Sequence, residues 1–278
     1  MGGSISAVLG GDATDELAAG VLDRVAAWAG FLSRHDPDSD LSRLNALCCA
    51  ETRVAPTLAA ALHGASSSRR LTGGLVDPAV HDARLAVETG GRPVPARTWA
   101  ITGDLVTRQP GTRLDLSGVA KGWMAERALW LPLVLPLPVA VIECDGDIAI
   151  RSDGSIAFDI EVEDPRADDP STLEPIAVIS LRLDRPVRIG VATSGTYRHS
   201  WAGRSHIVDP ATGEPASAGV LSATVIAPDA IAAEALAKVV VLRGAEAAPM
   251  LEAAGATAIA LTDRGTQLRF PGVDRWLA

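Results

Sequence analysis

A histidine and an aspartate lie three residues apart in a polar stretch, residues 205–213, with the sequence SHIVDPATG. A histidine exchanges a proton near neutral pH, and a neighbouring carboxylate can orient its ring. His206 is therefore a candidate general base, and Asp209 is a candidate partner for it. The same letters also fit a polar hairpin with a DPATG turn. The stretch alone does not decide between these two interpretations.

Two further stretches carry residue types that suit a phosphorylated ligand. Residues 192–197, ATSGTY, bring Thr193 and Ser194 together with Gly195 in turn-rich sequence. Residues 114–123, LDLSGVAKGW, put Lys121 between two glycines where a strand is expected to pass into a helix. Backbone N–H groups at a helix start, with an ammonium nearby, favour a phosphate. The alternative is an ordinary strand-to-helix turn with a surface lysine.

The alternating aspartates of residues 36–40, DPDSD, suggest a calcium loop. Leu41 stands where that loop needs glycine, and Leu47 stands where it needs a bidentate carboxylate. A helix-capping loop is the better interpretation. The sequence also has no Gly-x-Gly-x-x-Gly, no P-loop motif and no Gly-x-Ser-x-Gly elbow. A nucleotide that binds here would use another kind of cradle.

The elements that position these residues are mostly helices early in the chain and strands later. Apolar residues at helical spacing predict helices at residues 14–32, 40–47, 56–70, 117–129, 229–242 and 245–254. Strands are expected at residues 4–9, 99–106, 113–116, 139–150, 156–162, 177–183, 187–192, 220–226, 256–262 and 266–270. Strands and helices do not alternate regularly, and no linker or repeat is evident. We therefore expect an α+β fold in a single domain over residues 1–278.

Charge and cysteine content narrow the function classes. The formal net charge of −9 disfavours nucleic acid or an anionic membrane as the main partner. Three cysteines, an odd number, fit a reducing compartment better than a disulfide framework. The start of the sequence does not resemble a secretory signal, and the most apolar run, residues 130–142, contains three prolines and is too short to span a bilayer. We expect a cytoplasmic protein.

Taken together, these segments resemble one family, the ApbE-type flavin transferases (FAD:protein FMN transferases). The resemblance extends along nearly the whole chain, and the order and spacing of its segments make it specific. The segments that carry it are residues 1–3, 31–33, 39–45, 73–80, 114–122, 146–148, 163–166, 193–195, 205–213 and 233–238, with Gly244.

The resemblance implies a T-fold-related α+β fold of two packed lobes with FAD between them. It implies flavinylation: the FAD diphosphate is split, FMN is attached through its phosphate to a threonine or serine of an acceptor protein, and AMP leaves. Some members hydrolyse FAD to FMN and AMP instead. A divalent metal, usually Mg²⁺, lies on the diphosphate. By the same resemblance His206 is the base, and Asp209 holds the loop or the histidine. The residues near the flavin nucleotide are Lys121, Gly122, Asp145, Gly146, Asp147, Thr193, Ser194 and Gly195.

The sequence differs from this family at the positions of the metal ligands. Family ligands are an alanine carbonyl, matched by Ala120, and an aspartate and a threonine four residues apart on one helix face, which here are Glu234 and Lys238. Glutamate can bind magnesium, whereas a charged lysine cannot and repels it. Three alternatives follow: the ammonium replaces the metal; Lys238 pairs with Glu234 in a catalytically impaired FAD-binding protein; or Lys238 turns away and metal binds through Glu234, Ala120 and water. Asp145 also stands where the family commonly has glycine.

Overall fold

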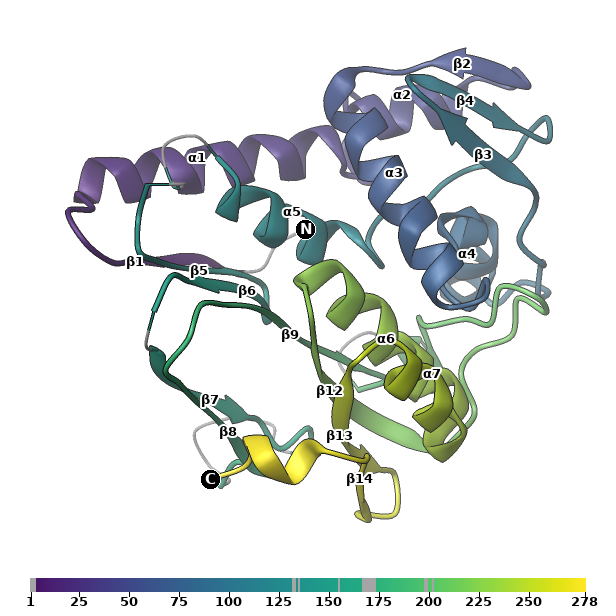
Figure 1. Ribbon diagram of the computed structural model, residues 1–278. Coiled ribbons are helices and arrows are strands. Elements are labelled where there is room, and N and C mark those ends of the chain that lie inside the picture. Colours follow the sequence, from purple (N-terminus) through teal and green to yellow (C-terminus); the bar gives the residue numbers. More distant parts are fainter. Residues whose placement is uncertain are drawn as a thin grey trace.

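Helices and antiparallel sheets form two closely packed lobes in a computed structural model of the chain (Figure 1). The structure describes residues 4–131, 134, 136–154, 156–166, 174–197, 200–201 and 203–278. The first segment of the resemblance, residues 1–3, lies outside them. The mixture of elements confirms the α+β class.

The larger lobe is built on a seven-stranded sheet in which every neighbouring pair is antiparallel. Its strand order is β1 (Ile5–Leu9), β5 (Val139–Cys144), β6 (Asp147–Ser152), β9 (Val187–Gly195), β12 (Val220–Ala227), β13 (Thr257–Thr262) and β14 (Gln267–Arg269).

Alternating side chains of this sheet enter two hydrophobic cores, one on each face, as the pleat of a strand requires. On β5, Ala140 and Ile142 belong to the helix-covered core, and Val141 belongs to the other. The helices on the first face are α1 (Asp15–Phe31), α5 (Ala120–Leu129) and α6 (Ala230–Arg243) (Figure 1). The pair β7 (Ile156–Val162) and β8 (Ala177–Leu183) contributes Val162 and Leu181 to the second core.

The smaller lobe lies against α5 and α6 and shares the helix-side core. Leu58 and Leu62 of its long helix belong to the same cluster as Trp123 and Leu236. Its elements are α2 (Asp40–Ala46), β2 (Glu51–Arg53), α3 (Pro56–Leu71), the 3-10 turn η1 (Pro78–Val80), α4 (His81–Thr89), β3 (Trp99–Thr102) and β4 (Leu105–Arg108), with strand order β2-β4-β3.

Short elements complete the described chain. They are β10 (Ser200–Trp201), β11 (Arg204–Ser205), η3 (Gly244–Ala247), α7 (Ala248–Ala253) and η4 (Val273–Trp276). The predicted helix at 245–254 is therefore a 3-10 turn followed by a short α-helix. Among the residues that the structure describes, no helix has both the length and the apolar character needed to cross a membrane.

Several sequence-based expectations about strands were wrong in detail. The expected strands at 99–106 and 139–150 are each interrupted by a turn, so that each contributes to a hairpin. The expected strand at 113–116 pairs with none of the strands that the structure describes. Its backbone is held instead by the amide of Asn45, which accepts from Leu114 N and donates to Leu114 O, both at 2.8 Å. The elements β2 and α4 were not predicted.

Polar side chains cap the starts of two helices. Ser39 caps α2, since its hydroxyl accepts from Ser42 N at 2.9 Å. The Asp36 side chain accepts from Asp38 N in the same loop. These bonds agree with the interpretation of residues 36–40 as a helix-capping loop. Asp229 caps α6 by accepting from Ala232 N at 2.8 Å. Satisfying N–H groups at a helix start in this way stabilises the helix.

Two glycines allow the N-terminal end of α6 to lie directly on the sheet and on α5. A Cβ added to Gly190 of β9 would be 2.2 Å from Ala230 N, and one added to Gly122 of α5 would be 2.4 Å from Ala230 O. Both distances are far below van der Waals contact and involve backbone atoms. The start of α6 is therefore positioned by the absence of two side chains.

We expect Gly190→Ala to lower the free energy of unfolding by at least about 2 kcal/mol, because backbone must move to admit the methyl group. Gly20→Ala in α1 is the matched control, since its Cβ would meet nothing within 4 Å. In the control, stability should stay the same or rise by up to about 1 kcal/mol. Urea denaturation measures both variants, and equal effects would contradict the packing argument.

Candidate functional site

One cavity of about 700 Å³ receives residues from both lobes. Ser33, Arg34 and Arg84 come from the smaller lobe side, and the strands of the large sheet line the opposite part. Eight of the sequence-predicted site residues line this cavity: Lys121, Asp145, Gly146, Thr193, Ser194, Gly195, His206 and Lys238. The other five, Ala120, Gly122, Asp147, Asp209 and Glu234, are not among the residues that line it. Segments far apart in the sequence therefore meet at one site.

Lys121, in the first turn of α5, reaches the turn between β5 and β6. Its Nζ donates to Asp145 O at 3.1 Å and lies 3.4 Å from Asp147 Oδ2. Asp145 (φ 50°) and Gly146 (φ 86°) both have positive φ, which is the requirement of a type I′ two-residue hairpin turn. This requirement explains why a glycine suits position 145, and aspartate is among the residues that tolerate it.

Asp147 is a buried carboxylate with little compensation. Both of its oxygens are buried without a hydrogen-bond partner among the described residues, although the Lys121 ammonium is close. Burial raises the pKa of Asp147 to about 7, against the opposing charge of Lys121. Burial of Lys121 disfavours its own charge, but Asp147 and Glu234 outweigh this and raise the pKa of the ammonium. Lys121 is therefore a firmly charged cation at the cavity wall.

Glu234 of α6 is buried and joins α6 to the start of α5. Its Oε2 accepts from Gly122 N at 2.8 Å, and its Oε1 lies 3.3 Å from Lys238 Nζ. Gly122 thus uses its N–H on Glu234 instead of facing the cavity. Lys238 Nζ is also 3.5 Å from Ser194 Oγ. Lys238 does not turn away from Glu234, so the third of the sequence-based alternatives is not supported.

The residues present do not fit a magnesium ion at the positions that the resemblance names. Gly122 N donates to one oxygen of Glu234, and the Lys238 ammonium pairs with the other. The carboxylate therefore already has a cation beside it. A protonated lysine has no lone pair to offer a metal. A dication beside it would be repelled across a short distance in a poorly solvated site.

The end of β9 presents hydroxyl groups and a close-packed glycine. Thr193 Oγ1 and Thr224 Oγ1 are 2.8 Å apart, which joins β9 to β12 at the cavity wall. A Cβ added to Gly195 would lie 2.4 Å from the ring of Tyr197. Glycine at 195 therefore lets Tyr197 fold back over the strand end, and both residues line the cavity.

His206 and Asp209 have different surroundings. His206 lines the cavity. The Asp209 carboxylate lies 2.7 Å from Arg243 Nη2 and accepts from Ala211 N at 2.8 Å, while its carbonyl accepts from Gly213 N. Asp209 therefore holds the 209–213 turn and joins it to the end of α6. Of the two roles that the resemblance implies, holding the loop or holding the histidine, these contacts correspond to the first.

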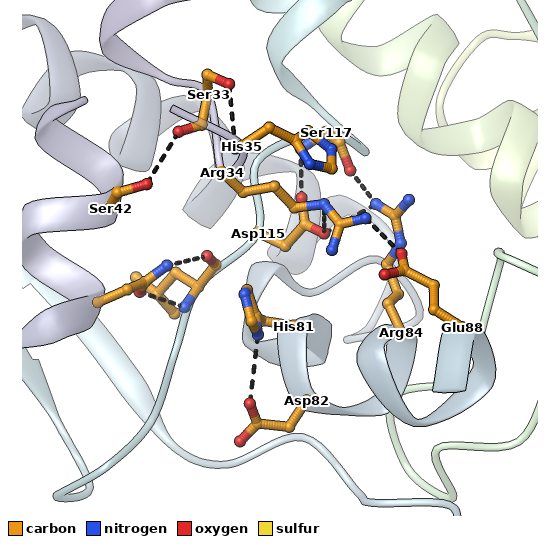
Figure 2. Close-up of polar contacts among 12 residues, drawn as sticks. Ser33, Arg34, His35, Ser42, His81, Asp82, Arg84, Glu88, Asp115 and Ser117 are labelled. Atoms are coloured by element: carbon orange, nitrogen blue, oxygen red, sulfur yellow. Dashed lines mark hydrogen bonds and ion pairs between the residues drawn. The ribbon is translucent and has the colours of Figure 1, made fainter. Parts of the chain in front are cut away.

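Sequence reasoning missed a buried ionic cluster at the cavity wall (Figure 2). Asp115 Oδ2 lies 2.9 Å from Arg84 Nη1 and 3.4 Å from Arg34 Nε. Arg84 also donates to Ser117, and Arg34 pairs with Glu88. Burial opposes the charge of Asp115, but Arg84 and Arg34 outweigh it and lower the pKa of the carboxyl. The helical spacing of Ala83, Ala86 and Val87 was the signal that could have revealed α4, which carries Arg84.

Comparison with known proteins gives consistent matches. The model of the ApbE family matches residues 1–260. A FAD:protein FMN transferase of Treponema pallidum (strain Nichols) is 29% identical over 126 residues, which are 40% of this chain and 33% of that protein. This chain thus matches about a third of that relative's length.

Solved structures match over the whole chain. The ApbE protein of Thermotoga maritima MSB8 has a TM-score of 0.82 at 24% identity, with 100% of this chain and 96% of that chain covered. The flavin transferase ApbE of Vibrio cholerae has a TM-score of 0.73 at 23% identity, with the same coverage. At these identities the structural matches show a common fold.

We expect Asp147→Asn to change how stability depends on pH. Burial raises the pKa of Asp147 from 3.8 to about 7, so between these values the folded state binds more protons than the unfolded state. The contribution of this carboxyl to stability is present below its unfolded pKa and is lost as pH rises towards its folded pKa. The free energy of unfolding of the variant, minus that of the wild type, should therefore increase from about pH 4 to about pH 7. Urea denaturation at several pH values tests this, and a constant difference would contradict it.

Proposed function

Because the chain belongs to the ApbE family, we propose that it is a FAD:protein FMN transferase. It splits the diphosphate of FAD and joins FMN, through its phosphate, to a threonine or serine of an acceptor protein. The observation that carries the proposal is the meeting of eight motif residues in one cavity of about 700 Å³. Hydrolysis of FAD to FMN and AMP is the reaction when water replaces the acceptor hydroxyl.

The proposed chemistry is an in-line displacement at phosphorus. The acceptor hydroxyl attacks the flavin-side phosphorus, the bond from this phosphorus to the bridging oxygen breaks, and AMP leaves. His206 takes the hydroxyl proton, a role that suits an imidazole at neutral pH. Asp209 and its ion pair with Arg243 support this by holding the turn that follows His206. Asp209 is thus a positioning residue.

The flavin nucleotide is proposed to lie along Lys121, the turn at Asp145 and Gly146, and residues 193–195. Lys121 offers a charged ammonium at the cavity wall, and the strand end offers hydroxyl groups. Asp147 lies behind Lys121 and fixes its position. Gly122 acts indirectly, since its N–H holds Glu234. The Mg²⁺ expected from the resemblance has no step in this proposal, because Lys238 already provides a cation to Glu234.

We further propose a cytoplasmic location and an acceptor in the same compartment. Support comes from three free thiols, of which Cys48 and Cys49 are exposed and Cys144 is buried. Exposed free thiols persist most readily in a reducing compartment. Fractionation of the host cell, with the chain detected by antibody, tests the location; recovery outside the cytoplasmic fraction would contradict it.

We expect His206→Ala to reduce the release of AMP from FAD by about 10²- to 10⁴-fold, the usual contribution of a general base. Binding of FAD should persist, since the rest of the cavity is unchanged. AMP is measured by chromatography, with and without a cell extract as the source of acceptor protein. His63→Ala is the matched control, because His63 bonds to Gly103 O outside the cavity. Undiminished release by the His206 variant would refute its role.

A second candidate function is a catalytically impaired FAD-binding protein on the same fold. It is favoured by one observation, the ion pair between Lys238 and Glu234, which uses the residues that the family gives to its metal. Absence of AMP with FAD still bound, in both magnesium and EDTA, supports this candidate.

We expect Lys238→Thr to make the protein respond to magnesium, because it removes the ammonium and leaves the Glu234 carboxylate for a metal. FAD affinity and AMP release should then both increase when magnesium is added. Calorimetric titration and the AMP assay provide the two measurements. An identical response to magnesium in variant and wild type would mean that Lys238 does not decide the metal dependence.

A further inference from the structure

Two arginines that take no part in the proposed chemistry face the same cavity. Arg34 lies between α1 and α2, and Arg84 lies on α4, so the two come from separate segments of the chain. Their side chains are only 10% and 13% exposed. Burying two guanidinium groups side by side is unfavourable unless each has partners. The N–H donors that these partners leave unused are the ones that a ligand in the cavity can reach.

Carboxylates pair with both guanidinium groups but use only part of their N–H donors. Arg34 Nη2 bonds to Glu88 and Arg84 Nη1 bonds to Asp115 and Ser117. Within the described part of the chain, Arg34 Nη1 and Arg84 Nη2 bond to no protein atom. The Nε atoms of both side chains are buried and make no hydrogen bond, so only the terminal NH₂ groups are open to a ligand. A guanidinium has five N–H donors in a fixed plane. Each arginine therefore keeps donors for a ligand while a carboxylate holds its position.

Lys238 lies beside the same segment and adds a third positive charge. Arg84, Asp115, Gly118 and Lys238 line both the main cavity and an adjoining recess of about 50 Å³. A Cβ added to Gly118 would be 3.3 Å from Lys238 Cε, so the lysine stem packs on this segment. Planar arginine forks with a neighbouring ammonium favour a ligand with several phosphate oxygens.

We propose that Arg34 and Arg84, with Lys238, bind the diphosphate of the dinucleotide and supply the positive charge that the reaction needs. This inference rests on the proposed function. When the bond from the flavin-side phosphorus to the bridging oxygen breaks, its electrons stay on that oxygen and increase the negative charge on the AMP phosphate. The side-chain cations neutralise this charge, so that the protein itself replaces a metal ion in the site. The misfit of magnesium at Glu234 and Lys238 has the same explanation.

The test compares FAD with riboflavin, which lacks both the diphosphate and the adenosine. FAD and riboflavin share the flavin ring, and riboflavin carries no phosphate. Binding of each to the full chain in EDTA is measured by calorimetric titration, with inorganic diphosphate as a competitor. Arg34→Gln and Arg84→Gln should each weaken FAD binding by at least about tenfold, the effect of losing a charge-assisted hydrogen bond. Riboflavin binding should change by less than about twofold.

Two further variants separate ligand binding from folding. Arg113→Gln is the matched control, an arginine that pairs with Asp82 outside the cavity lining, and it should bind FAD as the wild type does. Glu88→Gln keeps both arginines and removes a carboxylate that competes for Arg34. It should bind FAD at least as tightly as the wild type, and it keeps the inference testable if an arginine variant does not fold.

The outcomes distinguish this inference from the function on which it rests. Wild-type chain that binds FAD in EDTA, with weaker binding in the arginine variants, supports the diphosphate site even if no AMP is released. Arginine variants that bind FAD normally, or that lose FAD and riboflavin equally, overturn it. So does wild-type FAD binding that requires magnesium, or weaker FAD binding in Glu88→Gln. Wild-type chain that binds no FAD overturns both the inference and the proposed function.

Discussion

A carboxylate removed from water must find partners inside the protein, and this constraint shapes the cavity. Glu234 and Asp115 are both buried. Glu234 accepts from Gly122 N on α5 and pairs with Lys238 on its own helix, and Asp115 pairs with Arg84 and Arg34 from other segments. Glu234 joins the start of α5 to Lys238, and Asp115 joins α4 to the segment after α1 through Arg84 and Arg34. Taking away one partner leaves a buried charge uncompensated, which is among the costliest changes in a protein interior. The cations at the cavity wall are thus fixed by the carboxylates behind them.

The fold class and most helices could be predicted from the sequence because their signals are local. The spacing of apolar residues gave α1, α3 and α6 nearly to their ends, and Asp229 marked the start of α6. Strand ends were harder. The turn at Asp145 and Gly146 divides the expected strand at 139–150 into two. The Asp-Gly pair is a local hairpin signal, but the apolar residues on both sides of it favoured one long strand. Residues 113–116 look like a strand in isolation, but Asn45, far away in the sequence, takes the backbone hydrogen bonds of Leu114.

Site residues divide in the same way. Ordered motifs placed Lys121 and His206 among the candidates, and the structure brings both to one cavity. Asp209 belongs to a motif, yet its contacts are with Arg243 and its own turn, which spacing cannot distinguish from a contact with histidine. Arg34 and Arg84 belong to separate segments, so the pair exists only after the chain has folded around Asp115. A contact between two residues of separate segments cannot be predicted from the spacing of residues in a single sequence.

The helix α6 sets a fixed spacing between two parts of the site. Lys238 projects from its middle, and Arg243, five residues later, holds the turn that follows His206 through Asp209. Five residues of α-helix extend about 7.5 Å along the axis. A helix hardly stretches, so an insertion or deletion between these two residues would rotate one of them to another face as well as displace it. The length of this stretch is therefore as constrained as the identity of its side chains, and the chain can vary in composition there more readily than in length.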